Sequence, residues 1–88
     1  MKLIYTTQFK KDFKRVSKQG KDLKKLEIII ETLLNKKPLD KKFKDHSLAG
    51  KWKNHRDCHI EPDWLLIYQL TSNSLILERT GSHSDLFK

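Results

Sequence analysis

The 88-residue sequence predicts an α+β fold of the order strand-helix-helix-strand-strand-strand. Two observations lead to this fold. Apolar residues recur at helical spacing between residues 7 and 37, and from residue 51 onward the period becomes that of strands. Helices gathered ahead of consecutive strands are typical of a twisted antiparallel sheet with an antiparallel helix pair on one face. At this length we expect a single domain over residues 1–88.

The amino-terminal part is predicted to hold one strand and both helices. Residues 2–6 are rich in β-branched and aromatic side chains, which favours a strand. Thr7 is a plausible N-cap of the first helix, because its hydroxyl can accept a hydrogen bond from a free backbone N–H. Gly20 is placed to end that helix, Asp22 can cap the second, and Pro38 stops it. Because the loop between the helices spans about three residues, the helices should lie antiparallel.

The carboxy-terminal part is predicted to form the other strands. Residues 39–50 show no clear period and are expected to be a loop. Residues 51–61 alternate with period two, which predicts a strand. Residues 64–70 are almost continuously apolar and indicate a central strand buried on both faces. Residues 75–80 complete the sheet, and residues 81–88 form a short tail.

The charge is distributed unevenly along the chain. The net charge is +8 and the isoelectric point is near 9.7. The first 44 residues hold 14 Lys or Arg and 5 Asp or Glu, whereas the other 44 hold 5 and 6, with all four histidines. This pattern indicates a polyanion-binding surface beside a chemical site. A lysine-rich face that only keeps the protein in solution is the simpler alternative.

Several classes of protein are excluded by composition. The longest uninterrupted apolar run, from Trp64 to Tyr68, is far shorter than the roughly 20 residues that a membrane span needs. The amino terminus turns polar too soon for a signal peptide. A single cysteine excludes an internal disulfide framework. We therefore expect a cytoplasmic protein that makes no contact with membranes.

Metal binding and cysteine chemistry are not favoured. His55 and His59 would share a face on a helix, but along a strand they lie roughly 13 Å apart. That separation is too large for one tetrahedral ion. We expect no metal and no other cofactor. Cys58 is expected on the core face of its strand, as an inert small apolar residue.

A set of polar residues in the carboxy-terminal half can carry acid–base chemistry. An antiparallel hairpin of the last two strands would bring the ends of these strands to one edge of the sheet. Histidine exchanges protons near neutral pH, and the planar cation of arginine matches a phosphate. Any one of these residues, considered alone, more often has a structural role than a catalytic one. Arg79, for example, could simply pair with Glu78 or Asp57. The candidate catalytic residues are His46, His59, Asp63, Arg79 and His83.

Together these side chains suit a ribonuclease that uses no metal. One group removes the proton of a ribose 2′-hydroxyl, and cations stabilise the charge on the phosphorane. Another group protonates the departing 5′-oxygen. The inference depends on the convergence of the set and not on any single member.

A longer pattern is more specific still. The chain contains KDHSLAGKWKNHRDCHIEPDWLLIY, followed by ERTGSHSDLF. It resembles the YafQ-like branch of the RelE/ParE superfamily of bacterial toxins. The resemblance covers essentially the whole chain, in detail over residues 44–87 and only in pattern over the helices. It implies a RelE-like twisted sheet with a concave, basic catalytic face.

The resemblance also implies an activity and roles for residues. The activity would be cleavage of messenger RNA in the ribosomal A site, without a metal, leaving a 2′,3′-cyclic phosphate. His83 would be the leading general acid or base and Arg79 would contact the phosphate. The other three candidates would tune protons, position the RNA or share the acid–base work. Contacts with RNA are expected from Trp64, Phe87, Lys51 and Lys53.

Two of these expected RNA contacts have structural alternatives. Trp64 lies in an apolar strand, so a core position is an equal alternative. Phe87 either stacks on a base or packs the carboxy-terminal tail against the rest of the protein.

The implied partners are the ribosome with its messenger RNA and a cognate acidic antitoxin. That antitoxin would have a segment that folds on the toxin and a DNA-binding end. The net charge of +8 on this chain favours its fast capture by an acidic partner. Two other functions remain open. One is a gyrase-poisoning ParE-like toxin on the same fold, which needs no histidine set. The other is a non-catalytic RNA-binding module.

Overall fold

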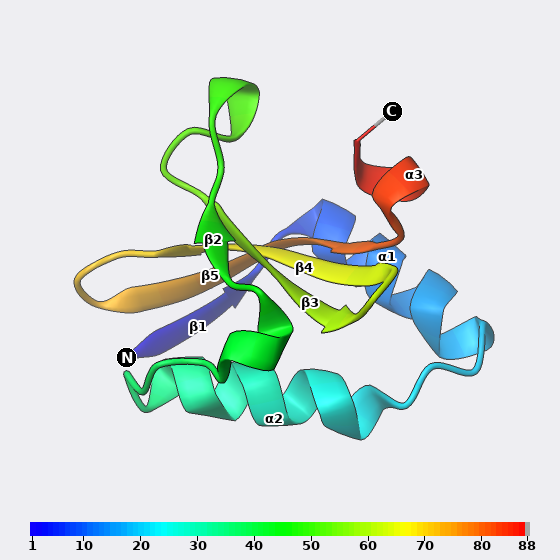
Figure 1. Cartoon of the computed structure of the whole chain (residues 1–88), viewed down its shortest axis with the longest axis horizontal. Coiled ribbons are helices and arrows are strands. Elements are labelled where there is room, and N and C mark those ends of the chain that lie inside the picture. Colours follow the sequence, from blue (N-terminus) through cyan, green and yellow to red (C-terminus); the bar gives the residue numbers. More distant parts are fainter. Residues whose placement is uncertain (88) are drawn as a thin grey trace.

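Residues 1–87, which the computed structural model describes, form a five-stranded sheet. Its strands are β1 (Lys2–Tyr5), β2 (His46–Ser47), β3 (Arg56–Glu61), β4 (Trp64–Leu70) and β5 (Ser74–Gly81). The strand order is β1-β5-β4-β3-β2 (Figure 1). β1 runs parallel to β5, whereas the other neighbours are antiparallel.

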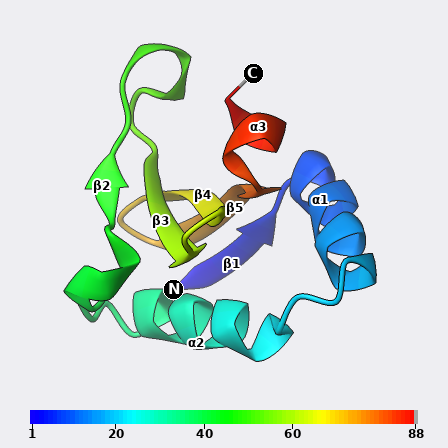
Figure 2. The ribbon, with the colours of Figure 1, turned by 45° about the vertical axis from the view of Figure 1, so that its right-hand side comes forward.

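The same residues form three α-helices and two short 3₁₀ helices. These are α1 (Thr7–Lys18), α2 (Leu23–Leu34), η1 (Lys41–Phe43), η2 (Gly50–Trp52) and α3 (His83–Leu86). In Figures 1 and 2, α1 and α2 diverge from their common loop and lie along different parts of the sheet. Both helices cover the same face of the sheet, as predicted, but they splay apart from the short loop instead of packing side by side along their length. None of the helices in this part of the chain is long and apolar enough to cross a membrane.

Capping side chains fix the ends of the two long helices. α1 is capped by Thr6 and not by Thr7, because the Thr6 hydroxyl accepts a hydrogen bond of 2.9 Å from the Phe9 N–H. Gly20 follows the end of α1 with a φ of +78°, a conformation that glycine adopts at little cost. Asp22 caps α2 as predicted, by accepting from the Lys24 N–H.

Apolar side chains fill both sides of the sheet. The smaller cluster, on the face opposite to α1 and α2, contains Leu65, Ile67 and Leu86. β4 is therefore buried on both faces from Trp64 to Tyr68, as its continuous apolar run predicted, whereas Leu70 at its end is exposed. Burial raises the pKa of the Cys58 thiol, which fits an inert core residue. The larger cluster, between the long helices and the sheet, contains Phe9, Val16, Leu26, Ile29, Leu33, Cys58, Ile60, Trp64, Leu66, Tyr68, Leu75 and Leu77.

Other elements differ from the sequence prediction. The expected strand from residue 51 begins only at Arg56, because residues 50–52 form η2 and Asn54 adopts a φ of +70°. Part of the expected loop over residues 39–50 is β2, which pairs with β3. The tail after β5 contains α3. These elements are too short to show a period.

Candidate active site

The candidate site lies on the face of the sheet opposite to α1 and α2. On β3, Asp57 and His59 alternate with Cys58 and Ile60, which belong to the core under the helices. The ring of His59 lies between two other imidazoles. Its centroid is 6.3 Å from that of His46 and 5.3 Å from that of His83. The fold thus gathers histidines from β2, β3 and α3.

His83 is held by Asp63, which lies in the turn between β3 and β4. The Nδ1 atom of His83 is 2.6 Å from Asp63 Oδ1, and the His83 backbone N–H donates to the same oxygen at 2.9 Å. These two contacts and the nearby charge keep the pKa of Asp63 below its usual value. Since a carboxylate can only accept, Nδ1 carries the proton, and Nε2 is the ring nitrogen available to a substrate.

The position of His83 at the start of α3 is fixed by a capping box. The Ser82 hydroxyl accepts from the Asp85 N–H at 3.2 Å, and Asp85 Oδ2 accepts from the Ser82 N–H at 3.1 Å. This reciprocal pair satisfies two backbone donors at the helix start. The helix therefore presents His83 from a defined turn and not from a loose tail.

The surroundings of His59 favour its neutral form. Partial burial lowers its pKa, and the positive charges of His83, Lys44 and His46 act in the same direction. The negative charge of Asp57 opposes them without reversing the result. A neutral imidazole near neutral pH is able to accept a proton.

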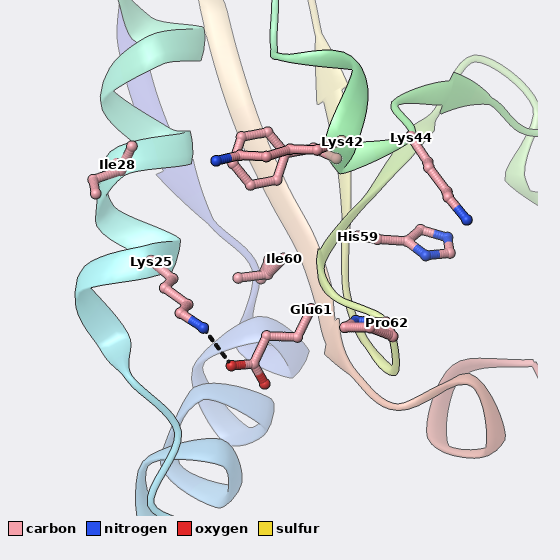
Figure 3. A pocket seen from close by; sticks show the side chains of 9 residues that line it. Lys25, Ile28, Lys42, Lys44, His59, Ile60, Glu61 and Pro62 are labelled. Atoms are coloured by element: carbon pink, nitrogen blue, oxygen red, sulfur yellow. Dashed lines mark hydrogen bonds and ion pairs between the residues drawn. The ribbon is translucent and has the colours of Figure 1, made fainter.

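His59 also borders a basic pocket of about 490 Å³ between α2, η1 and the end of β3 (Figure 3). Lys25, Lys42 and Lys44 line it, and Lys25 Nζ is 2.9 Å from Glu61 Oε2. Of these lysines, Lys44 extends to the same side of β3 as the His59 ring, whereas Lys25 and Lys42 lie on the side of α2 (Figure 3). A lysine beside a site of acid–base chemistry provides attraction for a phosphate backbone.

Asp57 is the residue that sequence reasoning missed. Its carboxylate is buried, and His46 Nε2 lies 3.1 Å from its Oδ1. Burial raises the pKa of Asp57, although the positive charges of nearby histidines oppose the rise. The signal was present in the alternation, because Asp57 is two residues before His59 on the same strand face. His46 Nδ1 is 2.8 Å from the Lys44 carbonyl oxygen, whereas the approach of its Nε2 to Asp57 forms no hydrogen bond and leaves Asp57 Oδ1 without a hydrogen-bond partner among the described residues.

Arg79 contacts α1 rather than the row of histidines. Its Nε donates to Asp12 Oδ2 at 2.8 Å and its Nη2 donates to Oδ1 at 3.1 Å. Asp12 is 0% exposed. Burial raises the pKa of Asp12, but hydrogen bonds from Arg79, Gln8 and Thr80 outweigh this and lower it. The pair uses two of the five N–H donors of the guanidinium group.

The predicted RNA-binding residues divide into two groups. Trp64 is 0% exposed, and its indole N–H donates to Thr80 Oγ1 at 3.0 Å. The prediction that Trp64 contacts RNA is therefore wrong, and the core alternative holds. Phe87 is 42% exposed at the end of α3. Lys51 and Lys53 are exposed in the segment between β2 and β3.

Comparison with known proteins now identifies the family. The model of a family described as "Bacterial toxin of type II toxin-antitoxin system, YafQ" matches residues 1–88. The chain belongs to the YafQ family. It is 49% identical over 84 residues to the mRNA interferase toxin YafQ of Escherichia coli strain K12, covering 94% of this chain and 91% of that protein.

Solved structures agree with the YafQ fold. A copper-bound L66S mutant toxin from Helicobacter pylori has a TM-score of 0.95 and 48% identity, over 99% of each chain. YafQ in the E. coli DinJ–YafQ complex has a TM-score of 0.91 and 47% identity, over 98% of this chain and 97% of that one. The family and the α+β class expected from the sequence are confirmed.

The histidine site of this YafQ-family chain can move protons. It combines an exposed His83 beside the Asp63 carboxylate, a His59 whose pKa is lowered, and Lys44 on the same side as the His59 ring. Among residues 1–87, no three His, Cys, Asp or Glu side chains are grouped so as to hold a metal ion.

Proposed function

We propose that this chain is an mRNA interferase, an endoribonuclease toxin that cleaves messenger RNA in the ribosomal A site. The observation that carries the proposal is the contact of His83 with Asp63, at 2.6 Å, beside the ring of His59. Histidines in different electrostatic surroundings serve as acid and base on opposite sides of one reaction. Membership of a toxin family whose E. coli members are named mRNA interferases supports the same activity.

The proposed reaction breaks one phosphodiester bond without adding water. His59 takes the proton of the ribose 2′-hydroxyl, and the resulting oxygen attacks the adjacent phosphorus. The bond from phosphorus to the 5′-oxygen breaks, and His83 gives its Nε2 proton to that oxygen. The products are a 2′,3′-cyclic phosphate and a free 5′-hydroxyl. The Asp63 carboxylate stabilises the positive charge on His83 before this transfer.

Charge on the phosphorane is stabilised by cations around the histidines. Arg79 is the proposed phosphate ligand, with Asp12 fixing the plane of its guanidinium group. Lys42 and Lys44, which line the pocket beside His59, extend the positive surface toward neighbouring phosphates.

His46 is proposed to position its neighbours and not to transfer protons. Its Nδ1 contacts the Lys44 carbonyl oxygen at 2.8 Å, and its Nε2 lies 3.1 Å from the buried Asp57 carboxylate. The His46 ring thereby covers the buried Asp57 carboxylate, beside the ring of His59.

RNA contacts outside the histidine row are proposed for three exposed residues. Phe87 is available for stacking on a base, which is a common mode of recognising single-stranded RNA. Lys51 and Lys53 are available for phosphates.

The proposed partners follow from the activity and the charge. The chain works with ribosomes in the cytoplasm and is neutralised by a cognate acidic antitoxin, as the E. coli complex of YafQ with DinJ suggests by analogy. A net charge of +8 favours rapid capture by an acidic partner.

Primer extension on a defined message tests the proposal, in a reconstituted translation reaction with and without ribosomes. Cuts at codon-phased positions that need ribosomes and disappear in His83→Ala support it. Equal cutting without ribosomes would contradict the ribosome-dependent part. If folded protein cuts the message in neither reaction, the proposed function is contradicted, and the alternatives are a gyrase poison or a non-catalytic RNA-binding module.

A further inference from the structure

We propose that Arg15, on α1, is a positioning residue that sets the place of His83. The inference rests on the proposed role of His83 in cleavage. It concerns how the junction between β5 and α3 is held, because His83 lies only two residues beyond the end of β5. Nothing in the chemistry of the reaction requires Arg15 itself to contact the RNA.

Arg15 joins three elements through one guanidinium group. Its Nη1 donates to Oδ1 of the fully buried Asp12 at 3.0 Å. Its Nη2 donates to the Thr80 backbone oxygen at 2.9 Å and lies 3.6 Å from Asp85 Oδ2. A planar, multidentate cation can satisfy acceptors on a helix, a strand and the start of a second helix at once.

The contacts of Arg15 differ in strength. The pair with Asp85 is 3.6 Å long and both side chains are 35% exposed, so it contributes little by itself. The hydrogen bonds to the buried carboxylate and to the Thr80 carbonyl are shorter, at 3.0 and 2.9 Å, and each has a partly buried donor–acceptor pair. These two bonds fix the guanidinium group, which then limits where the following residues can lie.

Gly81 shows how closely the guanidinium group covers this junction. The φ of Gly81 is +155°, and a Cβ atom there would lie 2.5 Å from Arg15 Nη2. The same Cβ would be 3.1 Å from Asp85 Oδ2. The chain therefore passes directly under Arg15 as it leaves β5, and the absence of a side chain makes that approach possible.

The path from Arg15 to the reacting ring is short and continuous. Asp85 caps α3 by accepting a hydrogen bond from the Ser82 N–H. His83 directly follows Ser82 in the chain and is the first residue of α3. The His83 N–H and ring then meet Asp63. Arg15 holds one side of this turn and Asp63 holds the other. Loss of Arg15 should let α3 shift while the contact between Arg79 and Asp12 remains.

The test compares Arg15→Gln, Arg15→Lys and the control Val16→Ala, which removes a buried apolar side chain from the same helix. We would measure cleavage of ribosome-bound message at varied substrate concentration, for kcat and KM, the thermal midpoint, and exchange of the His83 amide by NMR. His83→Ala serves as the reference for loss of the catalytic group. All rates are taken at a temperature where each variant is fully folded.

We expect Arg15→Gln to lower kcat about 10- to 100-fold with KM nearly unchanged, since small displacements of a catalytic group have effects of this size. Exchange of the His83 amide should become faster, and Arg15→Lys should restore part of both properties. Val16→Ala should lower the thermal midpoint without changing kcat or the exchange rate of the His83 amide.

Two outcomes would overturn the inference. One is an Arg15→Gln protein with the wild-type kcat and the wild-type amide exchange. The other is a kcat that falls equally in Val16→Ala, which would make the effect one of general stability. Failure of the proposed function is distinguishable from both, because His83→Ala would then cut at the wild-type rate.

Discussion

One oxygen of Asp63 accepts both the backbone N–H of His83, at 2.9 Å, and the Nδ1 proton of its ring, at 2.6 Å. The two contacts fix the main chain and the tautomer of the same residue. They also join the turn after β3 to the start of α3, two segments that are 20 positions apart in the sequence. The proposed proton donor is therefore oriented by a single side chain.

Replacement of Asp63 by asparagine should impair cleavage without unfolding the protein. The amide keeps an acceptor for the backbone N–H but loses the charge that stabilises a protonated ring. We expect kcat to fall about 10- to 100-fold, measured by single-turnover cleavage of ribosome-bound message. Asp22→Asn is the matched control, because asparagine caps a helix as well as aspartate does. Equal rates for both variants would remove Asp63 from the reaction.

Replacement of Trp64 should change stability and not KM, whereas replacement of Phe87 should change KM and not stability. Trp64→Phe removes the hydrogen bond to Thr80 from the core, so the free energy of unfolding should fall by about 1–2 kcal/mol while KM stays unchanged. Phe87→Ala changes an exposed ring, so stability should stay within about 0.5 kcal/mol. KM should rise about 5-fold or more if the ring stacks on a base. Urea unfolding and cleavage kinetics on both variants check this. A raised KM in Trp64→Phe alone would restore Trp64 as an RNA contact.

The pair of His55 and Glu78 should make stability depend on pH. His55 Nε2 is 2.8 Å from Glu78 Oε2. Burial lowers the pKa of His55, but the hydrogen bonds to Glu78 and the Lys53 carbonyl outweigh it and raise the pKa above 6.5. Protons then bind more tightly to the folded state, so the contribution is complete below pH 6.5 and is lost as pH rises through the raised value.

Glu78→Gln isolates this contribution. The difference in unfolding free energy between wild type and variant should be about 1 kcal/mol below pH 6.5 and smaller at alkaline pH. Urea titrations from about pH 5.5 to 9 measure it, and the contributions of other histidines cancel in the difference. A difference that grows with pH would contradict the assignment.

Asp57 should set the acidic limb of the rate profile through His59. Burial is the largest cause that lowers the pKa of His59, and the charge of Asp57 opposes it. Asp57→Asn removes that opposition, so the pKa of His59 should fall further and the acidic limb of kcat/KM should move to lower pH. Glu61→Gln, at the end of the same strand, is the control. An unchanged limb in Asp57→Asn would argue against His59 as the base.

Periodicity predicted the elements that are long and locally determined. α1, α2 and β4 each carry several apolar residues at regular spacing, so their positions were evident from the sequence. β2 has two residues and α3 has four, which is too few for any period. The parallel pairing of β1 with β5 joins residues about 70 positions apart, and only tertiary packing determines it.

The candidate site was predictable in composition but not in contacts. The residue types of His59, Asp63 and His83 suggested acid–base chemistry, and the sheet brings them together. The partner of Arg79 is Asp12, 67 positions away on a helix, so no local pattern could reveal it. Trp64 was ambiguous because apolar strands place aromatic rings on either face. Asp57 was visible on the polar face of β3, but its importance depends on burial.

The most direct measurement is single-turnover cleavage of ribosome-bound message that carries either oxygen or sulfur at the 5′ leaving position. With oxygen, we expect His83→Ala to be slower than wild type by about 10²- to 10⁴-fold, the usual contribution of a general acid. With sulfur, most of this loss should vanish, because a thiolate leaves without receiving a proton. Equal losses with both leaving groups, or no loss with either, would contradict the proposed role of His83 as the acid.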